Sequence, residues 1–262
     1  MIRSLWTAAT GMVVQQKNLD VIANNIANVN TNGYKASRAD FQELMYQTTR
    51  VAGVRTEQGN QVPTGIQIGM GALLASVEKV FMQGDFQQTQ NNLDLAVQGA
   101  GFFQITLPSG LTAYTRAGSF QTDSQGRVVT ADGYLVNPAI SIPQGTTALN
   151  IEADGTVSVT LQGQTSPQQI GQIQLATFTN QAGLSAMGQN LYLQTDASGT
   201  PIVGNPGQNG VGTLQQGYLE MSNVDIVQEM VNMIIAERAY ETNSKAIQAA
   251  NDMLQIANNV RR

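Results

Sequence analysis

The first thirty-five residues constrain the fold most, because their apolar positions keep one spacing for longer than those of any other stretch. From Ile2 to Ile26 these positions follow one another at steps of three and four, with one polar break at Gln16. This is a heptad stripe, and a helix with so narrow a stripe needs a partner helix. We call its apolar residues the N-terminal seam; they are Ile2, Leu5, Ala9, Met12, Leu19, Ala23 and Ile26.

A matching stripe lies near the other end of the chain. Apolar residues recur every seven positions there, and residues 224–260 contain neither Pro nor Gly. The pattern predicts a long helix that pairs with the first one. We expect Ser222 to cap its first amides, while Asp225 reaches back toward the start of the helix and opposes its positive end. The residues of this C-terminal seam are Met233, Tyr240, Ile247 and Leu254.

Composition excludes several classes of function. The chain has no Cys and no His, which removes disulfides, thiolate or imidazole metal sites and nucleophiles activated by His. Only 12% of residues are charged, the net charge is −5, and residues 128–237 contain no Lys or Arg, so a nucleic-acid partner is not expected. Ser76 and Lys79 have the spacing of a serine nucleophile and a lysine base, but no partner motif accompanies them, and we expect a strand there. The sequence therefore predicts no enzyme, no catalytic residue, no cofactor and no metal.

Direct membrane insertion is not expected either. No run of eighteen apolar residues is present, and residues 1–6 lead into an amphipathic helix instead of an apolar signal core. General secretory rules alone therefore predict a cytoplasmic protein.

The first helix should end where five Asn fall between Asn24 and Asn32, next to Gly33. Asn and Gly readily adopt the left-handed backbone that terminates a helix. Two interpretations of these asparagines stay open. They cap a fraying helix end, or their amides bond neighbouring helices at a subunit contact.

Residues 36–71 are expected to form a short amphipathic piece and an extended arm. A flexible linker is the alternative, but Val51, Val54, Val62, Ile66 and Ile68 are more apolar than a solvated linker requires. These residues suggest that the arm packs against another surface.

The centre of the chain, residues 72–221, has the pattern of a β domain. Residues 93–97, 102–105 and 173–178 look like strands, and Asp-Gly turns punctuate the segment. No helical segment interrupts the strands as a βαβ unit would require. The expected fold class is therefore α+β: paired long terminal helices, 1–35 and 222–262, resembling a coiled coil, with a central, mainly antiparallel all-β domain.

Several stretches resemble the bacterial flagellar rod and hook proteins. Residues 20–35, 93–103, 114–120 and 222–245 are similar to that family in the same order, so the resemblance covers the whole chain. The length and residues 1–6 and 190–193 are most similar to the members that form the distal rod. Ala117 departs from the family, which usually has an acidic residue there. The signature residues are Asn24, Asn25, Asn28, Asn32, Gly33, Ser222, Asn223, Arg238, Tyr240 and Asn243.

The resemblance implies a structural subunit that assembles with copies of itself into a helical tube, the drive shaft that spans the periplasm as part of the basal body. It further implies export without a cleaved signal peptide, which replaces the cytoplasmic expectation. The implied partners are proximal rod proteins, hook protein, the ring proteins of the peptidoglycan and outer-membrane layers, the rod cap and the flagellar type III export apparatus.

Phe41 and Met45 are similar to a short motif by which such subunits engage the export gate; a buried contact in the arm is the alternative. Within the family, a proximal rod or hook-type subunit is the alternative function. A secreted β-domain binding module is the alternative from a different class, but aromatic residues for such a site are sparse.

Overall fold

The computed structural model describes residues 2–53, 63–164 and 166–260. The chain divides into two compact units. The helical unit comprises Met1–Ala27, Ser37–Glu78 and Asp225–Arg262, and the β unit comprises Asn28–Ala36 and Lys79–Val224. The fold is α+β, with one long helix from each end of the chain and a mainly antiparallel β unit, which confirms the predicted fold class.

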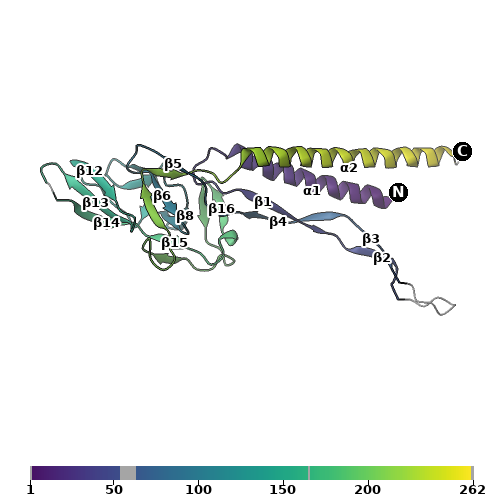
Figure 1. Cartoon of the computed structure of the whole chain (residues 1–262), viewed down its shortest axis with the longest axis horizontal. Helices are drawn as coiled ribbons and strands as arrows, with labels where there is room; N and C mark the ends of the chain where they lie inside the picture. Colours follow the sequence, from purple (N-terminus) through teal and green to yellow (C-terminus); the bar gives the residue numbers. More distant parts are fainter. Residues whose placement is uncertain (1, 54–62, 165, 261–262) are drawn as a thin grey trace. The chain divides into compact units, whose positions relative to one another are not determined.

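In the helical unit, α1 (Ile2–Ala27) packs along α2 (Ile226–Val260), and the two helices run in opposite directions (Figure 1). Gly11 marks their close approach, because a Cβ atom at that position would lie 2.8 Å from Nδ2 of Asn243. Glycine has no Cβ atom and so lets the helices come this near.

The cap of α2 differs from the prediction. Oδ1 of Asp225 accepts hydrogen bonds from the N–H groups of Val227 at 2.9 Å and Gln228 at 3.2 Å. The Ser222 hydroxyl accepts only from the N–H of Val224, at 3.3 Å. The expected cap by Ser222 was therefore wrong. The helix begins too late for Ser222 to reach its free amides, and Asp225, directly before the first turn, satisfies two of them.

The described residues between 37 and 79 form the two successive strand pairs of a long β hairpin (Figure 1). Strand β1 (Ser37–Glu43) pairs with β4 (Ala72–Lys79), and β2 (Tyr46–Arg50) pairs antiparallel with β3 (Ile66–Gly69). Ser76 and Lys79 both lie in β4, as expected of a strand. The predicted arm is thus largely a hairpin; its Val54 and Val62 lie outside the described residues.

The β unit contains a nine-stranded sheet in which β16, β17, β8, β7, β11, β10 and β9 follow one another, while β15 pairs with both β7 and β18. A three-stranded sheet and two strand pairs, β5 with β20 and β6 with β19, complete the unit. The nine strands are β7 (Phe102–Thr106), β8 (Thr112–Thr115), β9 (Phe120–Thr122), β10 (Val128–Thr130), β11 (Leu135–Asn137), β15 (Leu175–Thr177), β16 (Ser185–Gly188), β17 (Leu191–Leu193) and β18 (Ile202–Gly204). The other elements are β5 (Phe86–Gln88), β6 (Leu95–Gln98), β12 (Thr146–Ile151), β13 (Thr156–Leu161), β14 (Gln168–Gln172), the short 3-10 helix η1 (Gln181–Gly183), β19 (Thr213–Gln216) and β20 (Tyr218–Glu220).

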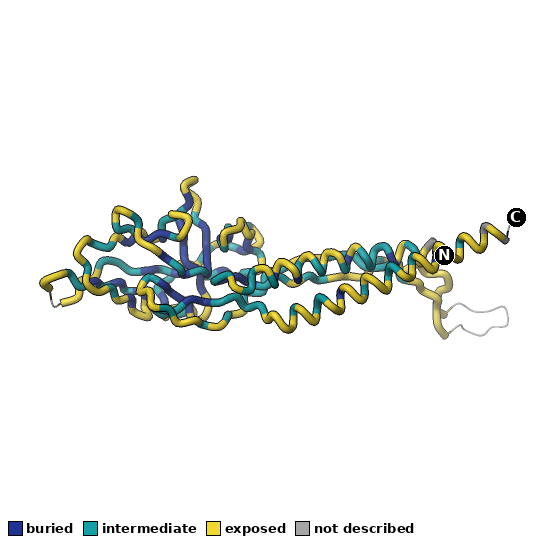
Figure 2. The backbone as a smooth tube through the Cα atoms, turned by 90° about the horizontal axis from the view of Figure 1, so that it is seen from above, coloured by how far each residue is buried: buried dark blue, intermediate teal, exposed yellow. Residues whose placement is uncertain are grey.

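Strand β7 lies at the centre of the core because both of its faces are covered. Phe103 and Ile105 point into the larger apolar cluster, and Phe102 into a smaller aromatic one that includes Tyr114 and Tyr192. Alternating side chains of a strand face opposite sides of the sheet, so a strand covered on both faces is mostly apolar, and the polar Gln104 of β7 is buried as well. Figure 2 shows that buried residues concentrate in the β unit, whereas the helices are mostly exposed or half-buried.

The predicted turns connect paired strands. Residues 123–126 join β9 to β10, Asp132 and Gly133 join β10 to β11, and Asp154 and Gly155 join β12 to β13. Gly126, Gly133 and Gly155 all have φ between +78° and +84°, a left-handed conformation that glycine adopts at little cost. The hairpin predictions at these turns are confirmed.

Candidate assembly surface

The two seams lie largely along the helix pair, but they do not contain its most buried positions. Met12, Leu19, Met233 and Ile247 are half-buried, whereas Tyr240 is 42% exposed. Of the remaining seam residues, Leu5, Ala9, Ile26 and Leu254 are half-buried, Ala23 is exposed, and the side chain of Ile2 is not described.

On α2 the buried positions are Ala236 and Ala250, which lie seven residues to either side of Asn243. Since Asn243 meets Gly11, the line through these three residues faces α1. The contact face is therefore rotated from the apolar seam, towards the smallest side chains. Small residues allow the two helix backbones to approach closely.

The opposite face of α2 exposes large apolar side chains. We call this group the outer ridge: Val227, Met230, Val231 and Ile234, each between 45% and 71% exposed. These positions follow the spacing i, i+3, i+4, i+7, which places them on one side of a helix. A contiguous exposed apolar group of this kind marks an interaction surface. The sequence contains this spacing of apolar residues, but the longer heptad stripe on the same helix obscured it.

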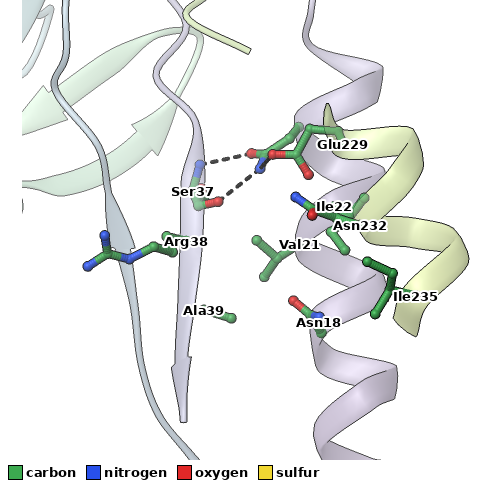
Figure 3. A pocket seen from close by; sticks show the side chains of 10 residues that line it. Asn18, Val21, Ile22, Ser37, Arg38, Ala39, Glu229, Asn232 and Ile235 are labelled. Atoms are coloured by element: carbon green, nitrogen blue, oxygen red, sulfur yellow. Dashed lines mark hydrogen bonds between the residues drawn. The ribbon is translucent and has the colours of Figure 1, made fainter. Parts of the chain in front are cut away.

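Asn25 joins α1 to the beginning of the hairpin. Its Nδ2 donates to the carbonyl of Ser37 at 2.8 Å, and its Oδ1 accepts from the Ser37 N–H at 2.8 Å. Nδ2 also donates to Oε1 of Glu229 on α2, at 3.2 Å. The dashed lines at Ser37 in Figure 3 show the first two bonds, at one end of a pocket of about 180 Å³ within the helical unit. Asn25 thus bonds both the hairpin and the neighbouring helix of its own chain; an amide that bonds a neighbouring helix agrees with the second interpretation, whose subunit contact stays a prediction.

Other signature residues hold the segments at the base of the β unit. Oδ1 of Asn223 accepts from the Ala36 N–H at 2.8 Å, and its Nδ2 donates to the carbonyls of Val80 at 2.8 Å and Met82 at 3.1 Å. One side chain therefore links three segments through their backbones. Such bonds are independent of the neighbouring side chains and fix the path of the chain.

The backbone of the Asn run is held in the same unit. Oδ1 of Asn28 accepts from the Thr31 hydroxyl at 3.3 Å, and the carbonyl of Asn32 accepts from Nδ2 of Asn190 at 3.1 Å. Gly33 has φ +70°, and a Cβ atom there would lie 2.5 Å from the backbone nitrogen of Ala117. Only glycine fits this position without movement of the backbone. Of the remaining signature residues, Asn24 is exposed, and Arg238 forms an exposed ion pair with Glu241 at 3.0 Å.

Three of the charged side chains buried in the β unit lie together, and we call them the buried ion cluster: Lys35, Arg116 and Glu220. Lys35 Nζ lies 2.6 Å from Oε1 of Glu220, and Arg116 NH1 lies 3.6 Å from Oε2 of the same carboxylate. Lys35 and Glu220 are at most 1% exposed, and Arg116 is 3% exposed. Sequence reasoning missed this cluster, because Lys35 and Glu220 are 185 residues apart and follow no common period.

Hydrogen bonds hold all three members of the cluster, although two of their polar atoms have no hydrogen-bond partner in the part of the chain that is described. Arg116 donates from NH1 to the carbonyl of Val97 at 3.2 Å and from NH2 to the carbonyl of Gly99 at 2.6 Å. Lys35 Nζ also donates to the Met82 carbonyl at 2.7 Å, and the Gly84 N–H donates to Oε1 of Glu220 at 3.0 Å. Within the described residues, Nε of Arg116 and Oε2 of Glu220 have no hydrogen-bond partner. Burial lowers the pKa of Lys35 below its ordinary range, although the charge of Glu220 opposes this shift. Burial likewise lowers the pKa of Arg116 and raises that of Tyr192.

Phe41 and Met45, the residues of the possible export motif, lie on the hairpin. Phe41 belongs to β1, and Met45 precedes β2. Both side chains are exposed, Met45 to 86%. Their exposure leaves them accessible in the folded hairpin.

The described part of the chain offers no group of three or more His, Cys, Asp or Glu side chains placed to hold a metal ion. Nor does it contain a helix with the length and apolar character needed to span a membrane.

Comparison with known proteins identifies the family. The models for a flagella basal body rod protein, the flagellar hook protein FlgE/F/G D1 domain and the flagellar basal body rod FlgEFG protein C-terminal region match residues 5–35, 96–159 and 215–260. Proteins called flagellar basal-body rod protein FlgG are similar over the full chain. That of Caulobacter vibrioides is 52% identical over 261 residues, covering 99% of this chain and 100% of the relative. The chain belongs to the flagellar basal-body rod protein family.

Two further rod proteins of the same name are similarly close. The FlgG of Borreliella burgdorferi is 49% identical over 264 residues, covering 100% of both chains. The FlgG of Buchnera aphidicola subsp. Schizaphis graminum is 52% identical over 255 residues, covering 97% of this chain and 98% of the relative. This confirms the resemblance to rod and hook proteins and assigns the chain to a structural rod protein of the flagellar basal body.

Proposed function

We propose that this chain is a non-catalytic subunit that assembles with copies of itself into the distal part of the rod, the drive shaft that links motor and proximal rod to the hook. The observation that carries the proposal is the outer ridge. Four large apolar side chains on one face of α2 are exposed in the single chain, and the chain belongs to a family of proteins that build the flagellar rod. Burying that surface between copies would stabilise a polymer.

The proposal includes partners at both ends and around the rod. Proximal rod proteins and hook protein would contact the ends of the polymer. The ring proteins of the peptidoglycan and outer-membrane layers would surround it, and the rod cap would bind the growing tip. The alternative is a proximal rod or hook-type subunit, and the full-length similarity to proteins named basal-body rod proteins favours the rod.

The position of the subunit in the organelle tests the function. We expect gold-labelled antibodies against the chain to bind purified basal bodies on the rod, next to the hook, once the rings have been removed. Basal bodies from cells that lack the gene serve as the control. Label confined to the hook, or absent from basal bodies, would contradict the proposal.

Export through the flagellar type III apparatus is a further part of the proposal, with Phe41 and Met45 as the residues that engage its gate. We expect Phe41→Ala with Met45→Ala to lower the amount of exported subunit several-fold, because both apolar side chains are lost from an exposed surface. The measurement is the ratio of exported to intracellular subunit on immunoblots. Val77→Ala, which removes another exposed apolar side chain of the hairpin, is the control. Equal export of the double variant and the control would contradict the role of the motif.

A further inference from the structure

An apolar groove lies in the helical unit between α1 and the hairpin, and we call it the hairpin groove. Trp6, Val13 and Lys17 of α1 line one side, and Leu44, Leu73 and Leu74 of the hairpin line the other. Its volume is about 310 Å³, which is near the lower end of the range for ligand-binding pockets. Trp6 and Val13 are 65% and 58% exposed, so the groove is open to a partner.

The outer ridge has the spacing of a helix that binds in such a groove. Amphipathic helices that dock into apolar grooves use anchors at i, i+3, i+4 and i+7, which is the spacing of residues 227, 230, 231 and 234. The ridge points away from α1, because the opposite face of α2, with Ala236 and Asn243, meets α1. The ridge of one copy therefore cannot reach the groove of that same copy while α1 and α2 stay paired.

Charges beside the two surfaces are complementary. Lys17 is the one charged residue that lines the groove, and Glu237 is exposed three residues beyond Ile234. Lys17 pairs with Asp20 only at 3.5 Å, and both side chains are more than half exposed. An exposed ion pair of this kind is weak, so Lys17 can readily pair with another carboxylate in place of Asp20.

We propose that the outer ridge of one copy occupies the hairpin groove of a second copy, with Ile234 against Val13 and Glu237 near Lys17. The inference rests on the proposed function and assigns the partner of the ridge. Ridge and groove are different patches of one unit, so the contact is heterologous. A heterologous contact that does not close into a ring generates an open helical polymer, as a rod requires.

Engineered cysteines test the contact directly, because the chain contains no Cys of its own. Cells would produce two variants together, Val13→Cys and Ile234→Cys, and their isolated basal bodies would be treated with a mild oxidant. We expect a disulfide-linked pair of subunits, since residues in contact across an interface come within the short Cα separation that a disulfide requires. The matched control replaces Ile234→Cys by Ala246→Cys, an exposed position of α2 outside the ridge.

The expected result is several-fold more linked subunit for Ile234→Cys than for Ala246→Cys. Equal linking of both pairs in basal bodies that contain the chain would overturn the inference and leave the proposed function standing. Absence of the chain from basal bodies of unaltered cells would overturn the proposed function, and the inference with it. As a second measurement, Ile234→Asp should abolish rod assembly while the helix content of the purified chain is unchanged. Normal assembly of that variant would also overturn the inference.

Discussion

Replacing Glu220 by Gln is expected to lower the free energy of unfolding of the β unit by about 3–5 kcal/mol, because it leaves two buried cations without a countercharge. The Gln side chain has nearly the same shape, and its oxygen can still accept from Lys35 and Gly84. Its amide nitrogen, however, would direct a donor at Arg116 in place of the carboxylate oxygen that now lies 3.6 Å away. The loss is thus electrostatic and not a loss of packing.

Removal of one cation should lower the free energy of unfolding by less than removal of the carboxylate does. Lys35→Met leaves Arg116 and Glu220 as a neutral pair and removes hydrogen bonds from a charged donor, which is worth about 1.5–3 kcal/mol. Lys245→Met, which breaks an exposed pair with Glu241 at 2.7 Å, is the control, and we expect no measurable change in the free energy of unfolding.

Denaturant unfolding, monitored by near-ultraviolet circular dichroism, measures how much unfolding free energy each of these three variants loses. The buried Tyr114 and Tyr192 report on the β unit, and the fluorescence of Trp6, the single Trp, reports separately on the helical unit. A smaller loss for Glu220→Gln than for Lys35→Met would contradict the assignment of Glu220 as the residue shared by both cations.

Ala236→Asp is expected to open the helix pair and abolish rod assembly while leaving the β unit folded. Ala236 is 1% exposed on the face of α2 that meets α1. A carboxylate there must either stay hydrated, which separates the helices, or be buried without a partner at a cost of several kcal/mol. The helical unit buries few other residues, so it has little stability to offset that cost.

Ala246→Asp is the matched control, because it makes the same substitution at an exposed position of the same helix. We expect it to assemble normally. Leu19→Asp and Ile247→Asp, at half-buried seam positions, should give intermediate losses. Motility and the yield of basal bodies measure assembly, and far-ultraviolet circular dichroism measures helix content. Motile cells with Ala236→Asp rods would show that this face does not hold the pair together.

The sequence by itself determined the two terminal helices and several turns of the central β segment. The heptad spacing from Ile2 to Ile26 and the seven-residue repeat from Met233 to Leu254 predicted α1 and α2, because a periodic pattern is a local property of the chain. The Asp-Gly turns at 132–133 and 154–155 predicted two hairpins, because a short turn with glycine in the left-handed conformation needs no distant partner.

Only the tertiary structure decided which faces meet and which residues share a site. The heptad pattern identified an apolar seam. In the structure, however, α1 and α2 approach each other closely at Gly11 and Asn243, so the most buried residues of α2 are Ala236 and Ala250. Likewise, the sequence pattern placed the residues of β4 in the central β domain, but in the structure this strand pairs with β1 of the hairpin. Lys35 meets Glu220 across 185 residues, a contact that depends on the path of the whole chain. The spacing of apolar residues shows which face of a segment tends to be buried, because that spacing is local. Which other segment covers the face depends on long-range packing, and long-range packing produces no repeating pattern in the sequence.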